Sequence, residues 1–214
     1  MAKRELELRQ AHRLLAPGPV TLLTSQYRGQ ANLMTASLVT VVSLDPSLVG
    51  VAIHPARLSH EFVSKSEQFA LNLPHIEQVA AVHRCGLLSG RDGDKFVTVG
   101  LTPEPATEVD APLVAECLAH LECGVVERVR LGDHDLFVGQ VLAASAAEEA
   151  FDAGWKVGEE GGQLLHHLGE NLYAALSKAF RAPRSPCAAA RPGASPCPRR
   201  HAGRGRWPPS AGRR

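Results

Sequence analysis

Hydrophobic and polar residues alternate over two long stretches of the chain, and a period of two is typical of β-strands. In residues 118–131, apolar side chains alternate with histidine, glutamate and arginine. Gly132 and Asp133 then predict a tight turn into residues 134–144, where a second alternation is interrupted at Gly139. We therefore expect these two stretches to pair as an antiparallel hairpin.

Four further β-type stretches precede this hairpin. They are expected to form strands at residues 20–25, 31–43, 48–53 and 68–73. Turn residues at 27–30 and 45–46 connect the first three, and such short connections predict an antiparallel meander rather than a βαβ unit. The stretch 48–53 is apolar throughout, which predicts that both of its faces are covered.

Short helices are expected between and around the strands. Apolar residues spaced one helical turn apart predict helices at 3–15, 58–66 and 76–88. Residues 89–95 form a polar loop in this interpretation, and residues 164–180 a short strand followed by a helix around Tyr173 and Leu176. Six antiparallel strands with short helices predict a mainly β protein with a closed or partly closed barrel, because closure removes exposed strand edges.

Charge divides the chain into two parts. Residues 1–180 hold all 22 acidic residues and 14 of the 23 lysines and arginines, whereas residues 181–214 hold nine arginines and no acid. Residues 181–214 also contain no Leu, Ile, Val or Phe, so they cannot bury enough apolar surface to offset their ordering entropy. We therefore expect one folded domain at 1–180 and a disordered basic tail at 181–214.

The composition favours a cytoplasmic protein. The first residues are polar and charged, without the apolar segment of a secretory signal, and no apolar stretch is long enough to span a bilayer. The five cysteines are odd in number and include no CxxC pair, which indicates reduced thiols. Cys85, Cys117 and Cys123 lie in apolar surroundings and are expected to act as small core hydrophobes.

Neither a metal site nor a nucleic-acid site is expected. Cys187, Cys197 and His201 match no standard zinc spacing, and the adjacent His166 and His167 would point to opposite faces of a strand. The arginine-rich tail lacks the interleaved aromatic residues on which bases stack. The motifs of Rossmann domains, P-loop NTPases, zincins and α/β-hydrolases are also absent from the sequence.

Four segments concentrate residues that carry chemistry, at 32–37, 54–59, 89–96 and 132–139. Arg57 offers a planar guanidinium for a phosphate, and Ser59 opens a helix whose N–H groups favour an anion. Lys95 adds a point charge, and the Asn32 carboxamide both donates and accepts, which suits the uracil-like edge of a flavin. The first three segments together therefore favour an anionic, phosphate-bearing ligand.

Each of these residues also has an interpretation without a function. Arg57 and Lys95 are also typical of solvated surface charges, and Thr35 and Ser37 are common on the solvated face of a strand. His134 lies in a tight turn that tolerates histidine for backbone reasons. The residue types alone leave these alternatives open.

The segments, in this order, resemble the flavin reductase-like family, the FMN-binding split-barrel group that includes flavoredoxins. The resemblance covers about residues 15–175. It is carried by the stretches NLMTAS, SLDPSLVGVAI, SGRDGDKF, HLECGVV and GDHDLFVGQV. Each stretch is short, but their order and spacing together are specific.

The resemblance implies a homodimer of six-stranded antiparallel Greek-key split β-barrels that binds FMN near the subunit interface. It also implies which residues contact the cofactor: Asn32, Thr35, Ala36, Ser37, Leu38, Ile53, Arg57, Ser59, Lys95, His134 and His167. Leu38 stands where many members carry an aromatic residue, so this chain lacks that ring.

The function that the resemblance implies is that of an FMN-dependent oxidoreductase. NADH or NADPH would pass hydride to flavin N5, in an NAD(P)H:flavin reductase or a flavoredoxin-like electron carrier, and the cofactor would carry the chemistry. A monooxygenase or another acceptor would take the electrons. The alternatives are a non-enzymatic flavin-binding or redox-sensing module, and a haem-binding split barrel with His134 or His167 as axial ligand.

Overall fold

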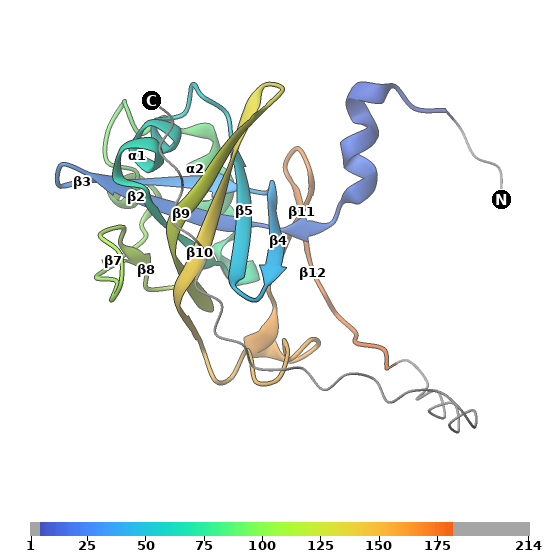
Figure 1. Cartoon of the computed structure of the whole chain (residues 1–214). Coiled ribbons are helices and arrows are strands. Elements are labelled where there is room, and N and C mark those ends of the chain that lie inside the picture. Colours follow the sequence, from blue (N-terminus) through green and yellow to red (C-terminus); the bar gives the residue numbers. More distant parts are fainter. Residues whose placement is uncertain (1–4, 182–214) are drawn as a thin grey trace, which may run out of the picture. The chain divides into compact units, whose positions relative to one another are not determined.

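A computed structural model describes residues 5–181, and its largest element is a seven-stranded antiparallel sheet (Figure 1). The strand order is β3-β2-β6-β9-β10-β5-β4. The bounds of these strands are Thr21–Tyr27 for β2, Gln30–Ala36 for β3, Val39–Leu44 for β4, Ser47–Ile53 for β5, Gln68–Leu73 for β6, Ala119–Leu131 for β9 and His134–Ala146 for β10.

The two ends of this sheet meet at one corner. β3 and β4 lie at opposite ends of the strand order, yet only Ser37 and Leu38 separate them in the chain. The sheet must therefore curl until its ends adjoin, and the Leu38 carbonyl accepts a hydrogen bond from the Ala52 N–H at 3.0 Å there. The expected strand at 31–43 is thus two strands, and seven strands replace the predicted six because the backbone has to turn this corner.

The predicted hairpin is confirmed, with a bulge where the alternation breaks. β9 pairs antiparallel with β10, and the register shifts between Val138 and Gly139. A Cβ added to Gly139 would lie 2.6 Å from Cζ of Phe69, which is fully buried. Gly139 therefore lets the Phe69 ring pack directly against the backbone of β10.

Replacing Gly139 by alanine is expected to lower the free energy of unfolding by about 1–3 kcal/mol, because the core has no space for the added methyl group. Gly154→Ala is the matched control, since a Cβ there meets no atom within 4 Å. Urea denaturation of the two variants measures the difference. Equal stability of both would show that the Phe69 ring moves aside without cost.

Two small sheets accompany the large one. The first has the order β1-β11-β12, with bounds Gly18–Pro19, Leu165–Gly169 and Leu172–Ala175. The second pairs β7 (Pro103–Glu104) with β8 (Leu113–Val114). The helix predicted around Tyr173 and Leu176 is wrong, because Gly169 at φ 126° and Glu170 at φ 54° turn the chain back and β12 pairs with β11 instead.

The helices are short, and two of the predicted elements, α1 and β6, have the predicted bounds. The helical segments are η1 (Leu8–Leu15), α1 (Leu58–Ser66), η2 (Ile76–Gln78), α2 (Val79–Leu87), α3 (Lys95–Val99) and η3 (Glu160–Gly162). η1 is a 3-10 helix, shorter than the predicted 3–15. Lys95 opens α3 instead of ending the loop, because the Asp94 carboxylate accepts hydrogen bonds from Phe96 N–H and Val97 N–H.

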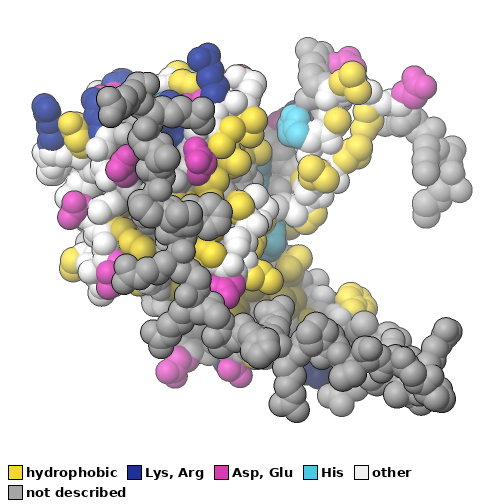
Figure 2. Space-filling view, viewed as in Figure 1, with side chains coloured by type: hydrophobic (Ala, Val, Ile, Leu, Met, Phe, Trp, Pro, Cys, Tyr) yellow, Lys and Arg dark blue, Asp and Glu magenta, His cyan; other side chains and the backbone are white. Residues whose placement is uncertain are grey.

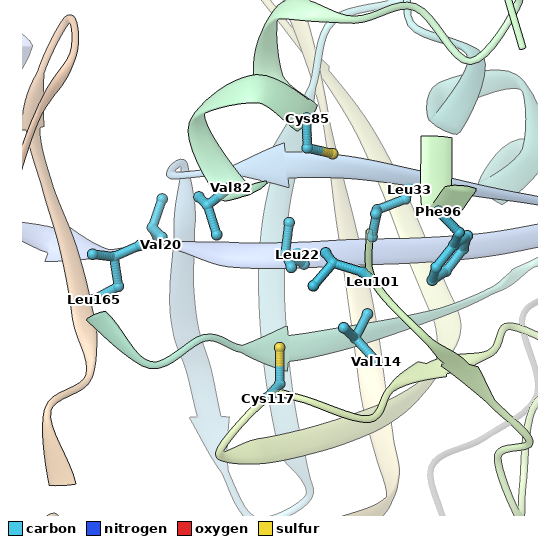
Figure 3. Packing of buried hydrophobic residues seen from close by; sticks show 10 residues of the cluster. All are labelled: Val20, Leu22, Leu33, Val82, Cys85, Phe96, Leu101, Val114, Cys117 and Leu165. Atoms are coloured by element: carbon cyan, nitrogen blue, oxygen red, sulfur yellow. The ribbon is translucent and has the colours of Figure 1, made fainter. Parts of the chain in front are cut away.

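The core has two main clusters, one between the sheet and helices α2 and α3, and a second made of residues from six strands of the sheet with Val63 of α1. Figure 3 shows one buried cluster in which Val82 and Cys85 of α2 approach Leu22 and Leu33 of the sheet. Cys117 belongs to the same cluster and Cys123 to a second one, so the prediction that three cysteines act as core hydrophobes is confirmed.

Within residues 5–181, no helix is long and apolar enough to cross a membrane. The described residues also contain no group of three or more His, Cys, Asp or Glu side chains placed to hold a metal ion. The predictions on Cys187, Cys197 and His201, and on the basic tail beyond Arg181, lie outside the described residues.

Candidate functional site

A cavity of about 510 Å³ opens between the end of β3, the loop before α1, helix α2 and the loop that leads into α3. Eight residues predicted from the sequence line it: Asn32, Thr35, Ala36, Ser37, Leu38, Arg57, Lys95 and His134. The fold therefore brings together segments that are up to about a hundred residues apart in the chain.

The cavity wall is positively charged. Arg57 and Lys95 both line it, and none of the described lining residues is acidic. Lys95 is only 7% exposed, and its burial lowers the pKa of the ammonium group; Cys85 offsets this in part, and the Arg57 charge lowers the pKa further. Two cations that share a cavity without a carboxylate form a site for an anion.

The side chain of Asn32 is fixed by a hydrogen bond to Ser59, which lies outside the cavity. Its Nδ2 donates to the Ser59 hydroxyl at 2.7 Å, and both side chains are buried. Ser59 does not line the cavity, so the structure makes it a support for Asn32 rather than part of the wall. A Cβ on Gly90 would lie 2.0 Å from the Asn32 Oδ1, so the 89–94 loop packs directly on this carboxamide.

Thr35 connects β3 to helix α2. Its hydroxyl donates to the Val82 carbonyl at 2.6 Å, so the side chain fixes α2 against the strand while the residue lines the cavity. The neighbouring Cys85 also lines the cavity, and burial raises the pKa of its thiol, an effect that Lys95 partly opposes. The thiol is therefore protonated at neutral pH.

Helix α1, which follows Arg57, is anchored to the sheet by an ionic cluster in which Asp135 and His60 are buried and Arg128 is exposed. The Asp135 carboxylate of β10 lies 2.9 Å from Nε2 of His60 in α1 and accepts from Nε of Arg128 in β9 at 2.8 Å. The hydrogen bond from His60 and then that from Arg128 lower the pKa of Asp135. Arg57 is the residue immediately before α1, so this cluster also fixes the position of the Arg57 backbone.

Besides Ser59, two residues predicted from the resemblance lie away from the cavity. Ile53 is fully buried in the second core cluster, and its neighbour Ala52 lines the cavity instead. Adjacent strand residues face opposite sides, so the structure places the Ala52 side chain, and not that of Ile53, on the cavity wall. His167 packs against the Tyr173 ring at 5.0 Å between ring centres, on β11, and does not line the cavity.

Among the lining residues that sequence reasoning missed, His54 is the one histidine. It lines the cavity, and its ring stands edge-on to His134 with 5.4 Å between the ring centres. His134 in turn bonds the Asp133 carboxylate through Nδ1 at 2.7 Å, which lowers the pKa of Asp133. His54 lies in the 54–59 segment that also holds Arg57, and this position in the sequence could have indicated that it belongs to the site.

Comparison with known proteins identifies the family. The model of the flavin reductase like domain matches residues 13–170, most of the chain. The chain belongs to the flavin reductase-like family. An uncharacterized protein of Pyrococcus abyssi is 40% identical to it over 145 residues, which cover 68% of this chain and 83% of that one.

Two characterised relatives add detail on the family. The NADH-dependent FAD reductase of Streptomyces globisporus is 34% identical over 133 residues, 60% of this chain and 70% of that one. The FMN-binding protein of Thermus thermophilus, solved with bound 1-cyclohex-2-enone, is 27% identical with a TM-score of 0.75, and the match covers 86% and 99% of the two chains. The expected mainly β, antiparallel split-barrel fold is thereby confirmed.

Proposed function

We propose that this flavin reductase-like chain binds FMN in the Arg57–Lys95 cavity and uses it as an NAD(P)H-dependent flavin reductase or a flavoredoxin-like electron carrier. The observation that carries the proposal is the pair of cations, one of them buried, that lines a cavity without an acidic residue among its described wall residues. The binding roles of the individual residues are part of the proposal.

The residues of the cavity fit the two chemically different parts of FMN. Arg57 and Lys95 would hold the phosphate, the first through its planar guanidinium and the second as a point charge. The short side chains of Ala36, Ser37 and Gly86 leave space beside β3 for a flat ring. Bound FMN would supply the hydride acceptor, so the chain needs to bind, orient and exclude water.

The remaining wall residues suit the ring of FMN rather than its phosphate. Met34, Leu38, Ala52 and Leu88 give the cavity an apolar side that excludes water from a bound ring. No residue has to act as a nucleophile, and the protonated Cys85 thiol is a poor one. The reduced flavin would then pass its electrons to a monooxygenase or another acceptor.

The absorbance spectrum of the purified protein, with and without added FMN, tests the cofactor. Flavin bands that persist after desalting support the proposal, and a Soret band would replace it with haem binding. Oxidation of NADH and NADPH in the presence of FMN then separates a reductase from a flavin-binding or redox-sensing module, which would bind FMN without turnover.

The FMN affinity is expected to fall as the pH rises from neutral toward 10.5, the ordinary pKa of lysine. Burial lowers the pKa of Lys95 in the ligand-free protein, whereas a bound phosphate would raise it, so binding takes up a proton near that pKa. Fluorescence titration with FMN across this range measures the effect. Lys95→Met should flatten the pH dependence, and an unchanged slope in this variant would exclude Lys95 as its source.

We also propose that the chain forms a homodimer through an exposed apolar patch beside the cavity. Val41, Val42 and Leu44 of β4 are 66%, 48% and 80% exposed, and Leu38 is half-exposed while lining the cavity. Figure 2 shows hydrophobic side chains over this side of the sheet. A patch of this kind is typical of a protein interface.

Substituting the patch is expected to produce monomers. Val41→Lys with Leu44→Glu would place two charges where the second copy docks, and sedimentation equilibrium measures the resulting mass. The control is Val97→Lys, which changes a more exposed valine on α3 outside the patch. A wild-type chain that sediments as a monomer at all concentrations would contradict the proposal.

A further inference from the structure

Lys95 is a buried lysine without a carboxylate partner. It is 7% exposed, and no carboxylate among residues 5–181 forms an ion pair with it. The carboxylate of the preceding residue, Asp94, accepts hydrogen bonds from Phe96 N–H and Val97 N–H instead. Lysine is rarely buried to this degree unless it is paired, so this position favours a functional role over a structural one.

The Arg57–Lys95 cavity gives a ligand access to this side chain. Lys95 is the first residue of α3 and lines the cavity, whereas Phe96 enters the buried cluster that also contains Cys85 (Figure 3). The Cys85 thiol forms a hydrogen bond with the Lys95 side chain. A lysine amine has several hydrogen-bonding positions, so this one contact leaves Nζ able to meet a ligand.

The surroundings of Lys95 favour the neutral amine. Burial lowers the pKa of the amine, the Cys85 thiol opposes this effect in part, and the Arg57 charge lowers the pKa further. The other titratable side chains on the described cavity wall are His54, Arg57, Cys85 and His134, and none of them is a carboxylate. A lysine that is desolvated beside a second cation is typical of amines that react with carbonyl groups.

We propose that Lys95 forms a Schiff base with small phosphorylated aldehydes that enter this cavity and pair their phosphate with Arg57. The inference concerns the cavity of the proposed FMN site, but it does not require that FMN binds there. Arg57 lines the same wall, and its planar guanidinium matches the oxygens of a phosphate. An aldehyde without a phosphate lacks this contact and is expected to react at higher concentrations only.

The step is a condensation without any change in oxidation state. The Nζ lone pair adds to the aldehyde carbon and forms the C–N bond, while one proton of the amine moves to the aldehyde oxygen. The resulting hydroxyl group then leaves with the second amine proton as water, and the C=N bond remains. The neutral amine that starts this sequence is the form that the burial of Lys95 favours.

The modification would compete with FMN for the cavity. Both ligands would use the Arg57 guanidinium for a phosphate, and the Schiff base would also occupy Lys95. A chain that carries the adduct is therefore expected to bind FMN only after hydrolysis restores the free amine. The cavity would in this way respond to the concentration of phosphorylated aldehydes.

Trapping of the imine followed by peptide mapping tests the proposal. The probe is glyceraldehyde 3-phosphate, and it is compared with glyceraldehyde, which lacks the phosphate. Cyanoborohydride reduces the imine to a stable secondary amine, and mass spectrometry then identifies the modified lysine. We expect half-maximal labelling of Lys95 at an about tenfold lower concentration of glyceraldehyde 3-phosphate than of glyceraldehyde.

Three variants separate the roles of the two cations. Lys95→Arg keeps the positive charge but cannot form an imine, so labelling at this position should be lost. Arg57→Ala should raise the half-maximal concentration of glyceraldehyde 3-phosphate to that of glyceraldehyde. Lys65→Arg is the matched control, because Lys65 pairs with Glu61 at 2.6 Å outside the cavity, and labelling of Lys95 should be unchanged in it.

The proposal is overturned by labelling spread evenly over the lysines, by equal potency of the two aldehydes, or by an intact preference for the phosphorylated aldehyde in Arg57→Ala. If Lys95→Arg fails to fold, the peptide map of the wild type still decides, because it locates the adduct without a variant. Saturating FMN should protect Lys95. Labelling of Lys95 that FMN leaves undiminished would contradict the FMN proposal and still support this one.

Discussion

Arg57→Ala weakens FMN binding by about 1.5–3 kcal/mol, a ten- to hundredfold rise in Kd, if the guanidinium makes the charged hydrogen bond to phosphate that the cavity suggests. Arg57 lines the cavity just before α1, and Lys95 would be left as the only Lys or Arg among the described wall residues. Isothermal titration with FMN measures the loss.

Two further variants sharpen this test. Arg91→Ala removes the same charge from a nearby exposed residue that pairs with Glu61 at 3.0 Å and does not line the cavity, so its FMN affinity should match the wild type. Arg57→Lys keeps the charge but loses the planar donor pair, and should fall between the two. An FMN affinity of Arg57→Ala equal to that of Arg91→Ala would remove Arg57 from the site.

Asn72→Ala is expected to destabilise the fold by about 3–5 kcal/mol, because it breaks a fully buried hydrogen-bond hub. The Nδ2 of Asn72 donates to the Leu22 carbonyl at 2.8 Å, and its Oδ1 accepts from the Val114 N–H at 2.9 Å. Nδ1 of His120 also lies 2.8 Å from the same oxygen. Alanine leaves these buried groups of β2, β8 and β9 without a partner.

Urea denaturation measures this loss, with Gln140→Ala as a control that removes an exposed amide side chain from β10. The control should change the free energy of unfolding by less than about 0.5 kcal/mol. A comparably small change in Asn72→Ala would mean that water or a shifted side chain replaces the lost partners. Reduced stability with unaltered FMN affinity of the folded fraction is expected, since Asn72 does not line the cavity.

The first prediction concerns FMN affinity and the second the stability of the fold. The Arg57 variant tests the site, because Arg57 lines the cavity, and the Asn72 variant tests the pairing of strand β6 with its neighbours β2 and β9. If both predictions hold, ligand binding depends on the residues that line the cavity, whereas the stability of the barrel depends on buried hydrogen bonds outside it.

The sequence located much of the cavity because its residues cluster in short segments. Asn32, Thr35 and Ala36 lie on β3, and Ser37 and Leu38 follow it directly, so one short segment supplies five of the lining residues. Arg57 and Lys95 each lie at the start of a helix, where loops deliver side chains to a site. The family resemblance implied that these segments form one site.

Side-chain direction was harder to predict. Ile53 and Ala52 are neighbours on β5, and choosing between them requires knowing which face of the strand meets the cavity. Ser59 has the right chemistry but lies behind Asn32, which only the packing of α1 against β3 reveals. A shift of one residue exchanges the two faces of a strand, so errors of this kind follow directly from the period of two.

The sequence by itself determined the alternating hairpin, the bounds of α1 and β6, the acidic body with its basic end, and the family. The tertiary structure alone decided that the strand at 31–43 breaks at Ser37-Leu38, that the rings of His54 and His134 meet, and that Ser59 hydrogen-bonds Asn32 from outside the cavity. The physical reason is that periodicity and local charge are properties of neighbouring residues. The closing of a sheet and the pairing of buried polar groups depend instead on contacts between residues far apart in the chain.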